Sequence, residues 1–224
     1  MEIKPIAYIS NPLVGKFGIP RQSGTTDIKS QIIFTPEYRD PSALKGIEEF
    51  SHLWLVWHFS EAVLTDFSPT VRPPRLGGNK RVGVFASRSP FRPNSLGLSC
   101  VKFEGLEKTS DGTVIIVSGA DLKNETPIFD IKPYLPAFDR PENAVGSYSD
   151  KNKDYRLKVD FPEELLCKVD NELRLPLIEI LAEDPRPSYQ DDQNRIYGFA
   201  FSEYEIKFSV IGEVLTVIGV NQKR

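Results

Sequence analysis

The chain has 224 residues, 40% of them hydrophobic and 11% aromatic, enough for one sizeable core or for a large domain with a small appendix. No apolar run reaches about eighteen residues, and the N-terminal MEIKPIAYIS lacks the basic and apolar parts of a signal peptide, so we expect no membrane association and a cytoplasmic location. The formal net charge of −3 by itself argues against a nucleic-acid partner.

Short β-branched and aromatic runs, separated by Gly, Pro, Asn and Asp, dominate the first two thirds of the chain. A helical turn or two is expected within residues 40–50, where Asp40 can cap and Pro41 suits the first helical position. The pattern predicts a mainly β, antiparallel, barrel-like N-terminal domain. Its strands are expected at residues 3–10, 30–35, 52–59, 81–86, 96–103, 113–119 and 127–135.

A segment rich in turn-forming residues predicts a domain boundary near residues 141–154. We therefore expect a first domain of residues 1–145 and a small α+β C-terminal domain of residues 155–224. In the second domain, residues 162–185 predict two short helices, opened by Pro162 and ending before Pro185, and residues 196–220 predict a terminal hairpin of strands.

The distribution of charge is more informative than its sum. From Phe67 to Phe103 there is no Asp or Glu, so the rest of the chain carries −10 against the seven cations Arg72, Arg75, Lys80, Arg81, Arg88, Arg92 and Lys102. Six of these seven lie within 21 residues rich in Pro and Gly, which is typical of a loop. Two interpretations stay open: a docking site for a phosphate or carboxylate, or a solvated face paired with acidic neighbours.

Several common signatures are missing from the sequence. It has no Gly-x-Gly-x-x-Gly after a strand, no P-loop and no alternation of strands and helices, so a Rossmann fold is excluded. It has no nucleophile elbow either. Cys100 and Cys167 form no Cys-x-x-Cys pair, and His52 and His58 have no third ligand nearby, so we expect neither a metal site nor a disulfide framework.

Five segments carry a resemblance to a known family. GIPRQSG, HLWLVWHF, RPPRLGGNKRVGVFASRSPFRPNSLGLS, DLKNETPIFDIKPYLP and ILAEDPRPSY occur in the order, and together resemble the sequences, of the TsaA-like or TrmO family of tRNA methyltransferases in its bacterial two-domain form. The resemblance implies a non-Rossmann β-barrel that binds S-adenosylmethionine and works as a homodimer. It also implies methylation of the exocyclic N6 of threonylcarbamoyladenosine at position 37, next to the tRNA anticodon.

Two of these segments depart from the family pattern. NETP stands where Asp-Gly-Thr-Pro is expected, and PNSLGLS stands where Pro-Asn-Pro-Ile-Gly is commoner. Glu125 thus replaces a glycine, although Asn124 before it can itself adopt a left-handed conformation.

The resemblance also implies a set of cofactor-binding residues. Arg21 can meet the methionyl carboxylate, Phe59 can stack on adenine, His58 can bond the ribose or a base edge, and Asp121 suits the ribose or the ammonium. The alternatives are an ordinary surface turn for GIPRQSG and a core histidine for His58. The full set is Pro20, Arg21, Gln22, His58, Phe59, Arg88, Leu98, Asp121, Leu122, Lys123 and Asn124.

The catalytic candidates are Asp130, Lys132 and Tyr134, which alternate to one face of a strand. The acceptor nitrogen is a poor nucleophile until it loses its proton, so Asp130 is a candidate base, and Lys132 can stabilise charge on the carbamoyl oxygen. The alternative is a structural ion pair across two strands.

Contacts to the tRNA anticodon loop are expected from Arg72, Arg75, Lys80, Arg81, Arg92, Arg186 and Tyr189. Arg186 and Tyr189 equally suit a corner where domains pack. A second class of function, a non-catalytic RNA-binding or S-adenosylmethionine-sensing module, also fits the same residues.

Overall fold

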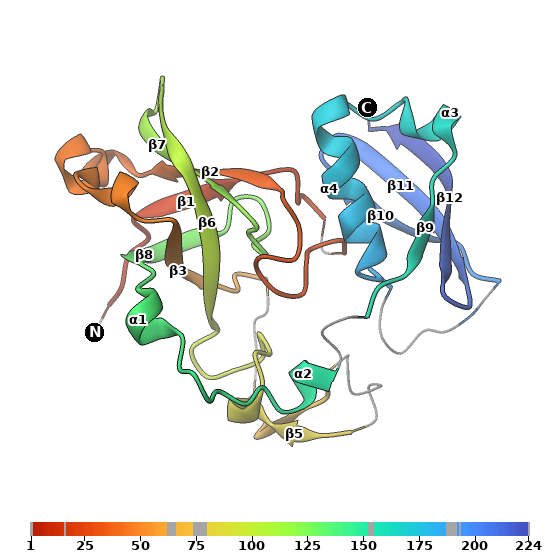
Figure 1. Ribbon diagram of the computed structural model, residues 1–224, viewed down its shortest axis with the longest axis horizontal. Coiled ribbons are helices and arrows are strands. Elements are labelled where there is room, and N and C mark those ends of the chain that lie inside the picture. The colour runs from red at the N-terminus through yellow and green to blue at the C-terminus, as the bar shows by residue number, and fades with distance from the viewer. Residues whose placement is uncertain are drawn as a thin grey trace.

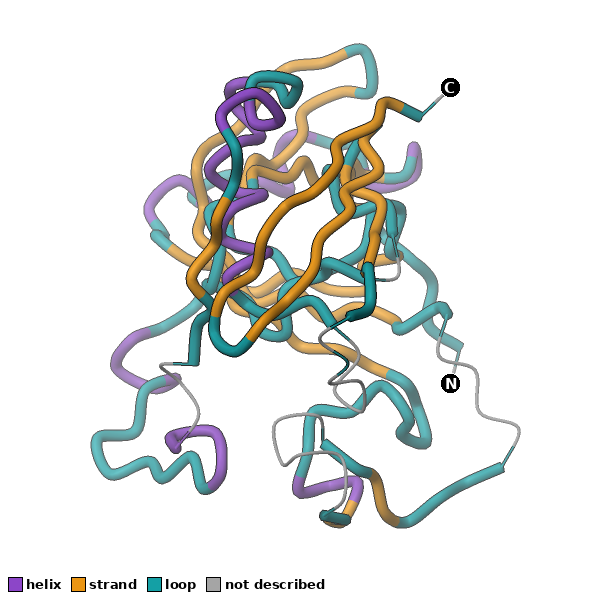
Figure 2. Tube along the Cα trace, turned by 90° about the vertical axis from the view of Figure 1, so that its right-hand side faces the viewer, coloured by secondary structure: helices purple, strands orange, loops and turns teal. Residues whose placement is uncertain are grey.

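The computed structural model describes residues 2–15, 17–61, 66–73, 80–151, 155–186, 192 and 194–223. A barrel and a smaller C-terminal domain lie side by side (Figure 1). In the turned view, strands dominate over helices along the chain (Figure 2), so the mainly β expectation is confirmed.

The barrel is a closed antiparallel sheet in the order β1-β2-β7-β6-β3-β8. Its strands form because apolar residues alternate toward the interior; on β3, for example, Leu53 and Leu55 are fully buried between half-buried neighbours. The bounds are β1 (Ala7–Ser10), β2 (Lys29–Phe34), β3 (His52–His58), β6 (Leu96–Thr109), β7 (Gly112–Ser118) and β8 (Pro127–Pro133).

Short elements lie outside the barrel wall. Asp40 caps a 3₁₀ turn by accepting the Ser42 N–H at 2.9 Å, as its sequence predicts. The strand predicted at residues 81–86 is shorter, because a 3₁₀ turn at Val84–Ala86 ends it. The remaining bounds are 3₁₀ turns at Pro36–Tyr38, Pro41–Leu44 and Ile47–Glu49, a two-stranded ribbon of β4 (Thr70–Val71) and β5 (Val82–Gly83), and helices α1 (Pro136–Asp139) and α2 (Tyr148–Lys151).

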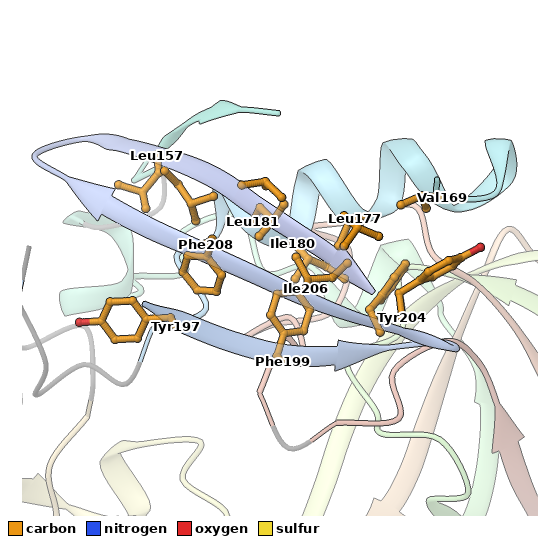
Figure 3. Close-up of a cluster of buried hydrophobic side chains, with 14 of the residues drawn as sticks. Leu157, Val169, Leu177, Ile180, Leu181, Tyr197, Phe199, Tyr204, Ile206 and Phe208 are labelled. Carbon is orange, nitrogen blue, oxygen red and sulfur yellow. The ribbon is translucent and has the colours of Figure 1, made fainter. Parts of the chain in front are cut away.

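The C-terminal domain is a four-stranded sheet in the order β10-β11-β12-β9 with helix α4 across one face (Figure 3). The predicted hairpin is wrong: three antiparallel strands replace it, and β9 pairs in parallel with β12. Alternate residues such as Phe199, Ile206 and Phe208 are buried in one cluster with Leu177 and Ile180 of α4. The bounds are β9 (Lys158–Asp160), α3 (Glu163–Leu166), α4 (Asn171–Ala182), β10 (Tyr197–Phe201), β11 (Tyr204–Ile211) and β12 (Val214–Gln222).

The loop between β1 and β2 belongs to the first domain but packs against the C-terminal domain. Leu13 and Ile28, which border it, are buried in the core cluster of the C-terminal domain. Gly18 has a φ of +83°, and a Cβ there would lie 2.3 Å from the Phe199 ring, so only glycine fits this close approach. The Asp27 N–H donates to a Glu179 carboxylate oxygen at 2.8 Å. The GIPRQSG segment is therefore held by the C-terminal domain.

Among the helices that the described residues form, none is long and apolar enough to cross a membrane.

Candidate functional site

A chain of polar contacts begins inside the barrel wall. Trp57 on β3 and Ser99 on β6 both point inward, and the Trp57 indole N–H donates to the Ser99 hydroxyl oxygen at 2.9 Å. Ser99 in turn donates to a carboxylate oxygen of Asp121 at 2.5 Å. Gly97 makes room for this arrangement, because a Cβ there would lie 2.2 Å from the Trp57 ring. The strands thus fix the position of the Asp121 carboxylate.

Two loops approach the same carboxylate. The Arg88 guanidinium, from the rigid loop before β6, donates to the Gln22 side-chain oxygen at 2.6 Å and lies close enough to Asp121 to interact with its charge. The backbone N–H of Ser23, in the loop between β1 and β2, also bonds Asp121. The structure therefore brings together Gln22, Arg88 and Asp121, three of the residues expected to bind a cofactor.

The Asp121 carboxyl has a perturbed acidity. Burial raises its pKa, and the bond from Ser99, backbone hydrogen bonds and the Arg88 charge only partly offset that rise. The ionised form of a carboxylate that is partly desolvated in this way is stabilised by a cationic or hydroxyl-bearing ligand. Such a ligand replaces the hydrogen bonds that water no longer makes.

The turn after Asp121 is fixed by its neighbours. The Asn11 side chain donates to the Leu122 carbonyl at 2.9 Å, and its backbone N–H donates to the Asn124 side-chain oxygen at 2.9 Å. Lys123 forms an ion pair with Glu61, and Leu122 is fully buried. Glu125 itself takes the left-handed conformation, with a φ of +65°. The sequence resemblance leads one to expect glycine at this position, and Glu125 adopts the left-handed conformation at a cost of about 1–2 kcal/mol.

For the other expected cofactor residues, no bond to the Asp121 carboxylate is seen within the described part of the chain. Phe59 packs on Trp57 with ring centroids 4.1 Å apart, and the His58 ring lies 6.1 Å from that of Phe129. Leu98 is 55% exposed on the outer face of the barrel. Pro20 is buried.

Arg21 points into the C-terminal domain. Its guanidinium donates to the backbone carbonyl of Asp184 at 2.9 Å and to that of Arg186 at 3.4 Å. The Gln22 amide in turn donates to the Arg21 carbonyl at 2.5 Å, so Arg21 is linked to the residue that bonds Arg88.

Two of the catalytic candidates, Asp130 and Lys132, share the outer face of β8, and Tyr134 follows directly after the strand ends at Pro133. Asp130 and Lys132 form an ion pair at 2.8 Å along one strand, not across two, and both are well exposed. Tyr134 packs beside Trp54, with ring centroids 5.7 Å apart.

A bulge explains this orientation. Trp57 pairs with Ile128 and Val56 with Asp130, so Phe129 is an extra residue that reverses the alternation along β8. Asp130 consequently shares the outward direction of Val56, opposite to Trp57 and Ser99. Asp130 and Lys132 thus belong to the opposite face of the barrel wall from the Asp121 carboxylate.

The acid-free segment, residues 67–103, divides into two parts where the structure describes it. Arg72, Lys80 and Arg81 are exposed around the β4–β5 ribbon, which lies away from the barrel in both views (Figures 1 and 2). Arg92 instead donates to the Ser87 and Ser89 carbonyls at 3.0 and 3.4 Å and so stiffens its own loop.

The remaining RNA candidates differ in what the structure describes. Arg186 is 10% exposed and pairs with Asp184 at 2.7 Å. This burial favours a role in packing at a domain corner over a direct contact with the tRNA anticodon loop. Arg75 and Tyr189 lie outside the described residues.

Ser99 and Trp57 are site residues to which no sequence motif assigns a role. The signal that could find them is the alternation of buried and exposed residues along β3 and β6. It places both side chains inside the barrel, where a buried polar group needs a hydrogen-bond partner. Within the described parts of the chain, no three His, Cys, Asp or Glu residues lie close enough to hold a metal ion.

Comparison with known proteins gives a consistent picture. A family model described as the tRNA-methyltransferase O N-terminal domain matches residues 8–140, and the TrmO C-terminal domain model matches residues 154–223. The chain is 35% identical over 218 residues to the tRNA (adenine(37)-N6)-methyltransferase of Escherichia coli (strain K12), which covers 93% of each chain. A relative in Pseudomonas aeruginosa, 36% identical over 213 residues and covering 91% of this chain and 90% of its own, bears a name that describes an S-adenosylmethionine-dependent methyltransferase.

A solved structure also resembles this fold. A crystal structure of TrmO from Pseudomonas aeruginosa superimposes with a TM-score of 0.77 and 30% sequence identity, over 99% of this chain and 98% of that one.

Proposed function

The chain belongs to the TrmO family of tRNA methyltransferases, and from this we infer that it is an S-adenosylmethionine-dependent enzyme that methylates N6 of adenine 37 in tRNA. We further propose that the adenine carries a threonylcarbamoyl group on that nitrogen and that the reaction takes place in the cytoplasm. The observation that carries the proposal is the Asp121 carboxylate, which accepts the Ser99 hydroxyl and feels the charge of Arg88, itself bonded to Gln22.

The donor set fits S-adenosylmethionine. Its methionyl part is a zwitterion, which needs an anionic group for the ammonium and a cationic donor for the carboxylate, and its ribose diol needs acceptors. Asp121, Arg88 and Gln22 supply these types of group within one cluster. We propose that Arg88 binds the carboxylate and that Asp121 binds the ammonium or the ribose.

The rest of the cofactor set frames this cluster in our proposal. Lys123 and Asn124 hold the turn through the contacts with Glu61 and Asn11, which supports backbone N–H groups as the cofactor contacts there. We assign aromatic contact to Phe59, contact through the backbone to the buried Pro20 and Leu122, and a bond to the ribose or a base edge to His58. Leu98 lies on the outer face of the wall, so it can contact only a cofactor held by a second subunit.

The bound cofactor supplies a methyl group already activated by its sulfonium, so the protein mainly has to position the acceptor nitrogen. That nitrogen, attached to both a purine and a carbamoyl group, is a weak nucleophile until its proton is removed. We propose that Asp130 accepts the proton, that Lys132 stabilises charge on the carbamoyl oxygen and that Tyr134 packs beside them.

The position of Asp130 restricts how it can act. A base must lie within hydrogen-bond reach of the proton, yet Asp130 lies on the opposite wall face from the Asp121 cluster. We therefore propose that the enzyme is a homodimer in which the outer face of one subunit's β8 serves the cofactor site of its partner. Leu98, Leu135 and Phe138, which are 55%, 41% and 81% exposed, supply the apolar area that such a contact needs.

For tRNA binding we propose that Arg72, Arg75, Lys80 and Arg81 neutralise phosphates of the anticodon arm. Exposure of the described three supports this, since phosphate contacts need accessible cations. Arg92 contributes by keeping its loop rigid, and Arg186 lies at the domain corner.

The test is methyl transfer to tRNA. Purified protein is incubated with radiolabelled S-adenosylmethionine and total tRNA from cells lacking this activity. Label in the tRNA supports the enzyme; binding of the cofactor and tRNA with no transfer would support the non-catalytic module instead.

A further inference from the structure

The C-terminal domain holds a buried ionic cluster whose partners reach the loop between β1 and β2, residues 11–28, which carries Arg21 and Gln22 and is called the cofactor loop below. The Asp184 carboxylate accepts bonds from the Arg186 Nε and terminal N–H groups at 2.7 and 2.8 Å and from the Tyr155 hydroxyl at 3.0 Å. Asp184 is 8% exposed and has a φ of +58°, a left-handed conformation that costs energy for a residue other than glycine. These three bonds keep the backbone at Asp184 in that unusual conformation.

The same backbone holds the cofactor loop. The Asp184 carbonyl accepts the Arg21 guanidinium at 2.9 Å, and the Arg186 carbonyl accepts it at 3.4 Å. A left-handed residue turns its carbonyl in a direction that an ordinary helical or extended residue would not reach. The position of Arg21 therefore depends on the conformation of Asp184.

A continuous set of contacts leads from Arg21 to the cofactor cluster. The Arg21 carbonyl accepts the Gln22 amide at 2.5 Å, and the Gln22 oxygen accepts the Arg88 guanidinium at 2.6 Å. The Arg88 charge in turn acts on the Asp121 carboxyl and offsets part of the rise in its pKa that burial causes. Three bonds thus connect the Asp184 backbone with the proposed carboxylate-binding arginine.

We propose that Asp184, Arg186 and Tyr155 form a positioning cluster for the cofactor loop: they fix the carbonyls that hold Arg21, and through Gln22 they set the place of Arg88. The inference rests on the proposed function for the identity of the ligand. It assigns to the C-terminal domain a part in S-adenosylmethionine binding, separate from any contact with tRNA.

The first experiment is Asp184→Asn, because asparagine also adopts the left-handed conformation but lacks the charge that pairs with Arg186. Calorimetry with S-adenosylmethionine, in the absence of tRNA, should show about threefold to tenfold weaker binding. In steady-state assays, KM for S-adenosylmethionine should rise by the same factor, while kcat and KM for tRNA stay within about twofold of wild type.

A second readout needs no ligand. Amide hydrogen exchange of residues 19–24 should be several-fold faster in Asp184→Asn, because Arg21 loses its fixed carbonyls. The control is Arg174→Gln, which removes bonds to the Val169 and Cys167 carbonyls inside the same domain. It should lower thermal stability without changing cofactor affinity or exchange in the loop.

The possible outcomes separate the two proposals. Wild-type affinity and unchanged loop exchange in Asp184→Asn would overturn the positioning cluster. If the wild-type protein binds no S-adenosylmethionine, the proposed function fails, and the exchange measurement still decides whether the cluster positions the loop. If Asp184→Asn does not fold, Tyr155→Phe is tested in the same way. It should show a smaller change in the same direction, and no change in either readout would overturn the inference.

Discussion

The Ser99 hydroxyl donates a 2.5 Å hydrogen bond to the Asp121 carboxylate, and Ser99 itself receives the Trp57 indole N–H at 2.9 Å. Because Ser99 and Trp57 are part of the barrel wall, this bond holds the Asp121 side chain, which lies in the loop after β7, in a fixed position. Burial of the Asp121 carboxylate at this place disfavours its ionised form, and the pH dependence of stability and of ligand binding follows from that.

The first prediction concerns Asp121→Asn. Burial raises the folded-state pKa of Asp121, so ionisation is disfavoured by folding, and its contribution to stability is lost as pH rises through that raised value. At pH 7 the variant should therefore unfold at an unchanged or higher temperature than wild type. It should also lose at least about tenfold in S-adenosylmethionine affinity, because the ligand loses a charged partner.

Calorimetry and thermal unfolding across pH check both parts of this prediction. Wild-type affinity should fall on acidification at a higher pH than an ordinary Asp would give, and the variant should lack this dependence. A variant with lower stability and normal binding at pH 7 would contradict a ligand-binding role for Asp121.

The second prediction concerns Arg88→Ala, which should weaken S-adenosylmethionine binding by about one to two orders of magnitude. Removal of a charge-assisted bond to the ligand is the physical reason. The matched control is Arg39→Ala, which removes the surface pair with Asp111 elsewhere on the barrel and should leave affinity unchanged. Equal affinities for the two variants would exclude Arg88 as the carboxylate-binding residue.

The sequence predicted the barrel strands well because their alternating burial is a local property. It missed β9, a three-residue strand whose parallel pairing with β12 joins residues more than fifty positions apart. A strict two-residue alternation also cannot predict the bulge at Phe129. That bulge determines which face of the wall Asp130 lies on. Long-range geometry of this kind has no local signature.

The candidate site shows the same limit. Gln22, Arg88 and Asp121 were named from the family resemblance, and the fold brings them together. Arg21 carries the same charge as Arg88 but donates to carbonyls of the other domain, a difference set by tertiary packing alone. The types of residue at the site can therefore be predicted from the sequence, whereas their hydrogen-bond partners depend on how the two domains pack.

The third prediction concerns the exposed cations Arg72 and Lys80. Each change to Ala should weaken tRNA binding and reduce the log–log salt slope by about 0.7 to 0.9, because one phosphate contact is lost. Lys108→Ala, an exposed lysine on β6 outside the acid-free segment, is the control and should keep the wild-type slope. Identical slopes for all three variants would mean that Arg72 and Lys80 do not contact phosphates.

The fourth prediction concerns Asp130→Asn. If Asp130 is the base, the variant should bind cofactor and tRNA normally but lose about two to four orders of magnitude in single-turnover rate. Higher pH should partly restore the rate, since the substrate nitrogen then ionises more often without help. Wild-type single-turnover rates would leave Asp130 and Lys132 as a structural ion pair.

A mixing experiment tests the dimer part of the same proposal. Asp130→Asn and Arg88→Ala, unfolded and refolded together, should form mixed dimers in which one composite site keeps both wild-type residues. Activity of the mixture should exceed that of either variant alone. Absence of recovery, with mixed dimers verified by mass spectrometry, would show that Asp130 does not serve a site in the partner.

The most direct test of the proposed function is nucleoside mass spectrometry of tRNA after incubation with the protein and S-adenosylmethionine. Threonylcarbamoyladenosine at position 37 should be replaced by a form one methyl group heavier, with the added methyl on N6. Asp121→Asn protein should leave the nucleoside unchanged at a cofactor concentration that suffices for wild type. Complete turnover of substrate tRNA by Asp121→Asn, or methylation at another nucleoside by wild type, would contradict the account.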